Sequence, residues 1–333
     1  MSMKTVVGQE YAKKRLGKLF TGEPGHAYIF LGPEGIGKRT MAKEVAKGFL
    51  CMSPTEDGAC GVCPSCRYFE SGTHPDFRHL FIPDGEKLIK VDTVRSKIGA
   101  DVSLFSQISK RKVYLIDGDG LNEQGQNALL KTLEEPPPGV HFLLTGSDVS
   151  HFLSTILSRS DVIALQPNTD EEMLFILEKK VGLSEASAMP YVLFSEGIPG
   201  RALALSESPW FSELRNESAD MFFSLANASV TECLTAVYGF FEENKDHVSD
   251  VLSVWQLIVR DLSVLLHGQE KERLMNKDFL EKMRLFLQKR PLTIEDTDRA
   301  GMVLSRTFSA LRANCSFEST ICSMLLSIVN HQE

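Results

Sequence analysis

Residues 26–40 read HAYIFLGPEGIGKRT, and most of the fold can be inferred outward from them. The apolar run AYIFL has the length and composition of a buried strand, and it leads directly into a glycine-rich loop. Gly32, Gly37 and Lys38 complete the pattern G-x-x-x-x-G-K, in which backbone amides, a helix N-terminus and the lysine surround phosphate groups. The stretch predicts a strand, a phosphate-binding loop and a helix in succession.

The loop departs from the usual pattern at the residue after the lysine. A serine or threonine hydroxyl normally binds Mg²⁺ there, but this chain has Arg39. Mg²⁺ prefers oxygen ligands, and a guanidinium would add positive charge beside the metal. Thr40 carries a hydroxyl, but one helical residue is a rotation of about 100°, so we expect this side chain to turn away from the site.

A second strand, VYLI, ends at Asp117, where a carboxylate can hold Mg²⁺ or its bound water. The next position, where a general-base glutamate is expected in this class of ATPase, is Gly118. Asp119 follows, but it is expected on the face opposite to residue 118, because the side chains of adjacent extended residues alternate. We therefore expect ATP or ADP to bind without hydrolysis. The candidate nucleotide-binding residues are Gly32, Gly35, Gly37, Lys38, Arg39, Thr40 and Asp117.

Four of the seven cysteines are crowded between residues 51 and 66, in the spacing C-x₈-C-x₂-C-x₂-C. Four thiolates suit a tetrahedral Zn²⁺, and a complete set leaves no open position for water, so such a site would be structural. The alternative is four ordinary free thiols in a loop of low apolar content. The predicted zinc ligands are Cys51, Cys60, Cys63 and Cys66.

Strands and helices are expected to alternate over the first 165 residues or so, which predicts a parallel sheet with helices between its strands. The prolines of EEPPPG (134–139) must end the helix before them. Strand patterns stop near residue 168, and helical spacing beyond Pro209 predicts a helical bundle. The expected strands are 27–31, 112–117, 141–145 and 162–165, and the expected helices 9–20, 38–50, 92–107, 122–135 and 150–158.

Composition restricts the class of protein. A chain of 333 residues can form two or three domains, and 43% hydrophobic with 24% charged residues is ordinary for a soluble globular protein. The formal net charge of −8 argues against a surface that grips nucleic acid throughout. The N-terminus lacks the apolar core of a signal peptide, and no uncharged apolar run approaches about 18 residues, so a cytoplasmic location is expected.

With these residues in place, the chain resembles the delta-prime subunits of bacterial DNA polymerase III clamp loaders, which are AAA+ proteins. The resemblance covers residues 5–205 well, and the remainder only by length and helical character. The matching stretches are VGQE (7–10), HAYIFLGPEGIGK (26–38), the four cysteines, SGTHPDFRHL (71–80), NALLKTLEEPP (127–137) and TILSRS (155–160).

The resemblance implies three domains: an AAA+ core (1–167) with an inserted zinc-binding knuckle (51–66), a small helical lid (168–208) and an all-α collar (209–333). It also implies a largely non-hydrolysing subunit that helps load the sliding clamp onto primed DNA during replication. The implied partners are delta and gamma/tau subunits, joined in a pentameric ring through the C-terminal domain. Contacts with the clamp and the DNA would be made mainly through the complex, and no membrane is involved.

The resemblance also assigns a catalytic role in trans. Arg159, in Ser158-Arg159-Ser160, matches the family's S-R-C triplet, whose arginine reaches the γ-phosphate bound by a neighbouring subunit. A guanidinium suits that task because it stays charged and bridges phosphate oxygens. The plain alternative is a surface ion pair with a local carboxylate such as Asp161. In the family's lid pattern G-x-x-R, the arginine follows the glycine by three residues. Here Arg201 follows Gly197 by four residues, which weakens a third nucleotide contact.

Two other functions are considered. An ATP-hydrolysing gamma/tau-type clamp-loader subunit would share the cysteines, but Arg39 and Gly118 argue against it. A zinc-dependent nucleic-acid-binding module is disfavoured because only Gly, Val, Pro and Ser lie between the cysteines of residues 60–66, and the first basic side chain is Arg67.

Overall fold

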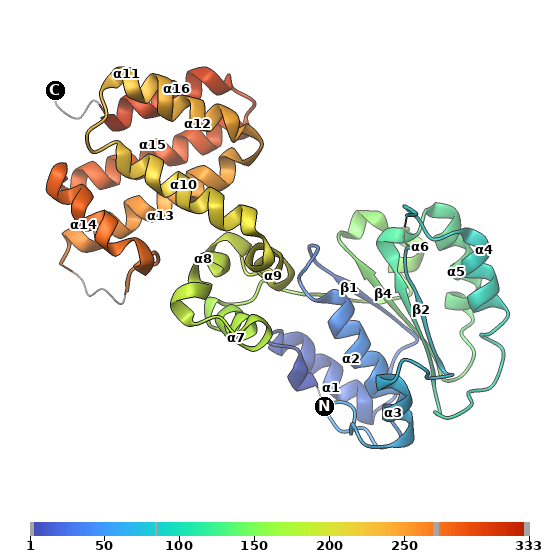
Figure 1. Ribbon diagram of the computed structural model, residues 1–333. Helices are drawn as coiled ribbons and strands as arrows, with labels where there is room; N and C mark the ends of the chain where they lie inside the picture. Colours follow the sequence, from blue (N-terminus) through green and yellow to red (C-terminus); the bar gives the residue numbers. More distant parts are fainter. Residues whose placement is uncertain (1–2, 84, 269–272, 330–333) are drawn as a thin grey trace. The chain divides into compact units, whose positions relative to one another are not determined.

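The computed structural model describes residues 3–83, 85–268 and 273–329 (Figure 1). The chain forms two compact units, unit 1 (Met1–Ile176 with Gly197–Arg201) and unit 2 (Leu177–Glu196 with Ala202–Glu333). The segment expected to be a lid is divided between them, so the three-domain boundaries stay a prediction. The ends of the expected core and collar, residues 1–2 and 330–333, lie outside the described residues.

Unit 1 contains a five-stranded parallel sheet in the order β2-β3-β4-β1-β5. The four expected strands are confirmed, with small shifts at their ends. The edge strand β2 was not expected, because charged and half-buried residues interrupt its apolar pattern. The strands are β1 (Ala27–Leu31), β2 (Phe77–Leu80), β3 (Lys112–Asp117), β4 (Val140–Gly146) and β5 (Asp161–Ala164).

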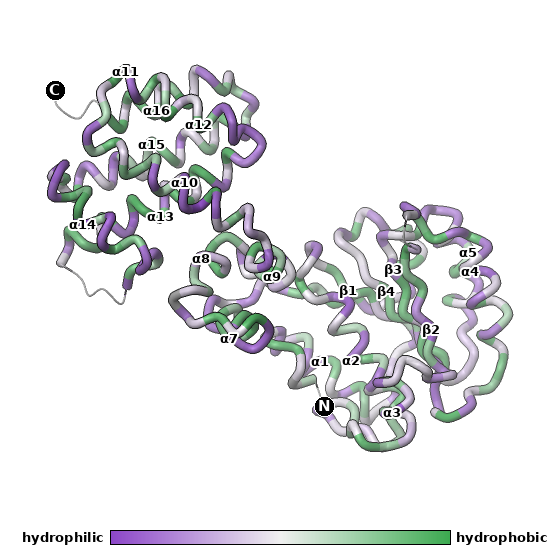
Figure 2. The backbone as a smooth tube through the Cα atoms, in the orientation of Figure 1, coloured by the Kyte–Doolittle hydropathy of each residue, from purple (hydrophilic) through white to green (hydrophobic). Residues whose placement is uncertain are grey.

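Side chains of the central strands alternate between two helical layers, which is why these strands read as continuous apolar runs. Tyr28, Phe30 and Leu115 pack on one face against α1 (Glu10–Thr21) and α2 (Lys38–Leu50). Ile29 and Ile116 pack on the other face, against residues of α4 (Val91–Val94), α5 (Glu123–Glu134) and α6 (Ser154–Leu157). Figure 1 shows the two layers, and Figure 2 shows hydrophobic stretches running through the sheet.

The expected helices 9–20, 38–50 and 122–135 are confirmed as α1, α2 and α5, and α5 ends before the prolines as expected. The expected helix 92–107 is shorter: α4 runs into a π-helical turn, Arg95–Gly99, and the carboxylate of Asp76 then binds the amides of residues 107–109. The expected helix 150–158 is broken, because Gln126 of α5 accepts the N–H of Leu153. A short helix, α3 (Pro64–Glu70), lies in the cysteine segment.

Unit 2 is helical throughout its described residues, which confirms the expected change of structure after about residue 168. Its helices alternate hydrophobic and hydrophilic segments in Figure 2. Among the described residues, no helix is both long and apolar enough to cross a membrane. The remaining helices are α7 (Asp170–Val181), which begins in unit 1, α8 (Glu185–Ser195), α9 (Pro199–Glu207), α10 (Pro209–Ser224), α11 (Val230–Glu232), α12 (Tyr238–Glu243), α13 (Val248–Leu266), α14 (Leu280–Lys289), α15 (Ile294–Arg312) and α16 (Phe317–Val329).

A fully buried carboxylate ties the end of α13 to the segment before α14. Asp261 is 0% exposed and accepts the backbone N–H groups of Met275 at 3.0 Å and Asn276 at 2.7 Å. The Asn276 amide and the Arg260 guanidinium donate to the same carboxylate at 2.9 and 2.8 Å. Its desolvation is offset by these four donors, so removing it would leave several buried donors unpaired.

We expect Asp261→Ala to lower the free energy of unfolding of unit 2 by about 3 kcal/mol, because buried donors lose their acceptor. The matched control, Asp220→Ala, removes an exposed ion pair with Lys282 and should cost less than about 1 kcal/mol. Both tryptophans, Trp210 and Trp255, belong to unit 2, so urea unfolding followed by tryptophan fluorescence reports this unit. Equal losses in the two variants would contradict the assignment.

Candidate nucleotide and metal sites

The phosphate-binding loop opens onto a cleft of about 660 Å³ at the carboxyl ends of the strands, a size typical of ligand pockets. The loop connects β1 to the N-terminus of α2, and Asp117 and Thr145 come from the ends of β3 and β4. Six of the seven candidate nucleotide-binding residues line the cleft, and the seventh, Gly32, begins the loop. The lining residues are Glu34, Gly35, Gly37, Lys38, Arg39, Thr40, Ile82, Asp117, Asp119, Thr145 and Ser147.

The most distinctive contact in the cleft joins Arg39 to Asp117. The guanidinium Nη2 lies 2.6 Å from Asp117 Oδ2, and the hydroxyl of Thr145 donates to Oδ1 at 2.9 Å. Asp117 is mostly buried, with 17% of its side chain exposed, whereas Arg39 is 56% exposed. Both carboxylate oxygens therefore already have donors from the protein.

Two geometrical expectations concern residues beside the loop. Thr40 is among the residues that line the cleft, and the expectation that its hydroxyl turns away from the metal position stays a prediction. Asp119 was expected on the face opposite to residue 118, as in extended chain, but residues 118–120 form a 3₁₀ turn. Asp119 lines the cleft together with Asp117. Asp119 Oδ1 accepts the N–H and the hydroxyl of Ser147 at 2.9 and 3.0 Å.

Lys38 is folded back onto its own loop. Its Nζ donates to the carbonyl of Gly32 at 2.6 Å and to that of Pro33 at 3.1 Å. Burial lowers the pKa of the Lys38 amine from its ordinary value, and the carboxylates of Asp119 and Glu34 oppose that shift. Carbonyl oxygens thus occupy the positions around the ammonium that phosphate oxygens would take.

A direct backbone contact closes the loop against the segment Gly197–Arg201, which also belongs to unit 1. The N–H of Gly200 donates to the carbonyl of Gly35 at 2.9 Å. Gly35 has a φ of +82°, and a Cβ built on it would lie 3.2 Å from the Cα of Gly200. Only a residue without a side chain permits the backbone at position 200 to approach the loop this closely. The displaced Arg201 is the next residue.

The position expected for a general base has no room for a side chain. A Cβ built on Gly118 would lie 2.5 Å from a ring carbon of Phe152 and 2.6 Å from the carbonyl oxygen of Thr145. Phe152 is buried in the core, and the carbonyl belongs to β4, so neither can withdraw cheaply. The absence of a glutamate is therefore built into the packing.

The four clustered cysteines converge, with all their Sγ atoms within 4.8 Å of one another. Cys51 and Cys63 are separated by 3.9 Å between sulfurs, and Cys60 and Cys66 by 4.0 Å. A tetrahedron with metal–sulfur bonds of about 2.3 Å has edges of about 3.8 Å, so this donor set fits a four-coordinate ion. The pKa of the Cys60 thiol is lowered to about 6, chiefly by the backbone N–H of Val62.

The cysteine segment is joined to the sheet by a buried network that includes His74. The hydroxyls of Ser65 and Ser109 both donate to the carbonyl of Leu50, at 2.6 and 2.8 Å, and both lie within 3.2 Å of His74 Nε2. His74 Nδ1 accepts the N–H of Asp76, so Nε2 carries the proton of the neutral ring. Burial lowers the pKa of His74, which favours this neutral form. Through His74, the stretch SGTHPD is thus bonded to the segment that carries the clustered cysteines.

Arg159 lies just after α6, and it is not among the residues that line the cleft. Its Nη2 pairs with Glu134 at 3.0 Å, and its Nη1 donates to the carbonyl of Thr155 at 2.9 Å. The plain alternative, a surface pair with a local carboxylate, is thus met by Glu134. The example named for it, Asp161, pairs instead with Arg15 at 2.6 Å. The two family-like stretches NALLKTLEEPP and TILSRS therefore meet through one ion pair.

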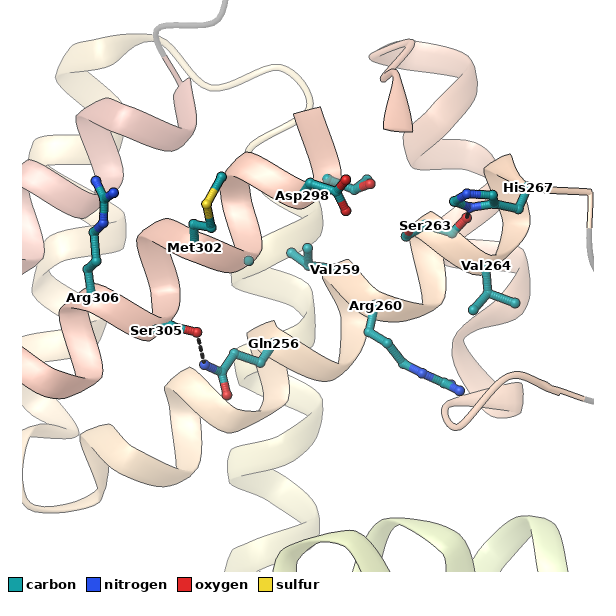
Figure 3. A pocket seen from close by; sticks show the side chains of 12 residues that line it. Gln256, Val259, Arg260, Ser263, Val264, His267, Asp298, Met302, Ser305 and Arg306 are labelled. Atoms are coloured by element: carbon teal, nitrogen blue, oxygen red, sulfur yellow. Dashed lines mark hydrogen bonds between the residues drawn. The ribbon is translucent and has the colours of Figure 1, made fainter. Parts of the chain in front are cut away.

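A second concavity, of about 730 Å³, lies in unit 2 between α13 and α15 (Figure 3). Gln256 donates to Ser305 at 3.5 Å across it, and Arg260, Met302 and Arg306 border it. None of the predicted site residues is among its lining residues. His267, which lines it, is bonded to the backbone carbonyl of Ser263 rather than to the Ser263 hydroxyl, so this pair does not form a base and a nucleophile. We therefore keep the cleft of unit 1 as the candidate functional site.

Several functional neighbours were missed from the sequence. Thr145 binds Asp117, Glu134 binds Arg159, and Gly200 binds the phosphate loop. Thr145 carried a weak signal, a polar residue at the end of an otherwise apolar strand. Gly200 belongs to the displaced G-x-x-R pattern, which had pointed to a nucleotide contact, whereas the pairing of Glu134 with Arg159 had no local signal.

Comparison with known proteins gives one consistent family. Residues 8–169 match the family model described as DNA polymerase III, delta subunit. The delta-prime subunit of Pseudomonas aeruginosa PAO1 is 44% identical over 135 residues, covering 40% of this chain and 41% of that protein. The delta-prime subunit of Escherichia coli K12 is 31% identical over 185 residues, covering 55% of each.

The E. coli K12 tau subunit is 31% identical over 277 residues, covering 79% of this chain and 42% of that protein. The matched segments thus span about half the length of these relatives. The parallel sheet, the phosphate-binding loop after β1 and the acidic end of β3 agree with an AAA+ core. Over residues 8–169, this chain is therefore similar to the DNA polymerase III delta subunits.

Proposed function

We propose that this protein is the delta-prime subunit of a DNA polymerase III clamp loader, a largely non-hydrolysing member of a ring that loads the sliding clamp onto primed DNA. The observation that carries the proposal is the Arg39–Asp117 ion pair, which occupies the position where an ATPase subunit would hold Mg²⁺. The 44% identity to a delta-prime subunit supports the same choice. The protein would act in the cytoplasm beside delta and gamma/tau subunits, joined through its C-terminal helices.

The gamma/tau-type alternative has one observation in its favour, the tau match over 79% of this chain. Hydrolysis needs a metal held between the loop and the end of β3, and a base aimed at water. Here the metal position is filled by Arg39, and residue 118 has no space for a side chain. The geometry therefore favours delta-prime over an ATP-hydrolysing subunit.

The four-cysteine cluster serves in this proposal as a structural Zn²⁺ site. Soft thiolate ligands in a complete tetrahedral set favour zinc and leave no position for a reacting water. The ion would join α2, which ends before Cys51, to α3, whose N-cap is Cys63. It would thereby stabilise a segment with little apolar content of its own.

Arg159 serves as a finger that acts on a nucleotide bound by a neighbouring subunit. Its ion pair with Glu134 is partly exposed, with 35% of the Arg159 side chain and 50% of the Glu134 side chain accessible. Such pairs contribute little free energy, so a phosphate on a neighbour can replace the carboxylate at small cost. Two phosphate oxygens can also accept hydrogen bonds from both terminal nitrogens of the guanidinium.

We expect about one zinc ion per purified chain, because the spacing and the convergence of the four sulfurs define a single tetrahedral site. Elemental analysis should show the zinc content falling sharply in Cys60→Ser and Cys66→Ser. Cys315→Ser, which removes an exposed cysteine outside the cluster, should leave it unchanged. A chain purified without chelators that contains no zinc would contradict the assignment.

We expect the isolated chain to release phosphate from ATP no faster than a Lys38→Ala variant, since neither a metal site nor a base position is available. A sensitive phosphate-release assay provides the measurement, and the variant controls for contaminating ATPases. Turnover by the unmodified chain that disappears in Lys38→Ala would favour the gamma/tau-type alternative.

In the reconstituted clamp loader, we expect Arg159→Ala to lower DNA-stimulated ATPase and slow clamp loading while the ring still assembles. Fingers of this kind contribute on the order of 10³ or more at one site, but sites with their own fingers continue to turn over, so the loss should be partial. Lys38→Ala should leave the ATPase nearly unchanged.

The matched control is Arg15→Ala, which removes a surface arginine of similar exposure, 38%, that pairs with Asp161. Its ATPase and clamp loading should equal those of the unmodified complex. Size-exclusion chromatography checks assembly of each complex. Full activity of the Arg159→Ala complex would show that this residue forms only a structural ion pair. Equal defects from Arg159→Ala and Lys38→Ala would identify the cleft as an active site.

A further inference from the structure

Arg39 occupies one of the two positions between which P-loop enzymes hold Mg²⁺, and its side chain binds the residue at the other. In those enzymes, the residue after the lysine supplies a hydroxyl, and an acidic residue at the end of another strand holds the metal from the other side. Here the same two positions are Arg39 and Asp117, and they are bonded directly at 2.6 Å. The second oxygen of Asp117 accepts the Thr145 hydroxyl at 2.9 Å. A protein cation thus stands where the metal would stand.

A metal ion would have to displace this arrangement at a cost. Mg²⁺ requires close, near-octahedral oxygen ligands, and Asp117 is the carboxylate best placed to supply one. Binding it there would break a charge-assisted hydrogen bond and leave the guanidinium beside a divalent cation. Asp119, the other carboxylate of the cleft, already accepts two hydrogen bonds from Ser147.

The phosphate-binding features of the cleft are nevertheless intact. The loop opens at the N-terminus of α2, a helix of 13 residues, and Lys38 is held there by the carbonyls of Gly32 and Pro33. Arg39 is more than half exposed and lines the cleft, so a ligand in the cleft can reach its side chain. A polyphosphate would therefore meet two protein cations without a metal ion.

We propose that the cleft binds the polyphosphate of ADP or ATP in metal-free form, with Arg39, fixed by Asp117, as the counter-ion in place of Mg²⁺. The proposal rests on the nucleotide-binding role stated above and specifies which form of the ligand is recognised. Chelation by Mg²⁺ reduces the negative charge of a nucleotide, so the Mg²⁺ complex should bind no more tightly than the free anion. For ATP, we expect the Mg²⁺ complex to bind more weakly than the metal-free anion. That is the reverse of an ordinary P-loop site.

The test measures ADP and ATP binding to the isolated full-length chain by titration calorimetry, in buffer prepared without Mg²⁺ or chelator and in excess Mg²⁺, at constant ionic strength. We expect dissociation constants without Mg²⁺ equal to or lower than those in Mg²⁺. Binding that tightens by about tenfold or more when Mg²⁺ is added would overturn the proposal. Absence of binding in both conditions would overturn it too, while the subunit role, which is measured by ring assembly and ATPase, would stand.

Arg39→Thr is the informative variant, because it restores the hydroxyl and frees Asp117 at the same time. We expect its affinity without Mg²⁺ to fall by about tenfold, the effect of one lost charge-assisted contact, and to recover when Mg²⁺ is added. Arg95→Thr, which removes an exposed arginine of the π-helical turn, is the matched control and should bind as the unmodified chain does. Circular dichroism checks that both variants fold, and an Arg39→Thr chain without Mg²⁺ dependence would count against the proposal.

Discussion

A parallel sheet has to be covered on both faces, and the rest of unit 1 depends on that constraint. Alternate residues of β1, β3 and β4 enter two separate apolar layers, one under α1 and α2 and the other under α4, α5 and α6. Because the strands are parallel, their carboxyl ends meet at one edge. The glycine loop, Asp117 and Thr145 are therefore brought together by packing that has no direct connection with phosphate chemistry.

At that edge, two features from different elements both disfavour ATP hydrolysis. Arg39, at the start of α2, is paired with the carboxylate at the end of β3, and Gly118 is pressed against Phe152 and the backbone of β4. The first disfavours a hydrated divalent metal, and the second leaves no room for a side chain at position 118. The loop amides and Lys38 depend on neither, so affinity for phosphate and capacity for hydrolysis are physically separable in this fold.

The cysteine cluster is connected to the same framework by polar groups in the core. Leu50 ends α2 immediately before the first cysteine, and its carbonyl accepts the hydroxyls of Ser65 and Ser109. His74 completes this network in its neutral form, and Asp76 binds three successive amides at residues 107–109. A metal ion in the cluster would therefore stabilise α2 at its C-terminus, opposite the phosphate-binding end.

The sequence by itself determined the central strands, the helices α1, α2 and α5, the glycine loop and the cysteine spacing, because each rests on a strong local pattern. It did not reveal β2, whose charged residues suit a sheet edge, or the break at Leu153, whose amide is taken by Gln126 of another helix. Only the tertiary structure decided the partners of Arg39 and Arg159. Arg39 and Asp117 are 78 residues apart, and their pairing follows from how α2 packs against the sheet, which no local signal encodes.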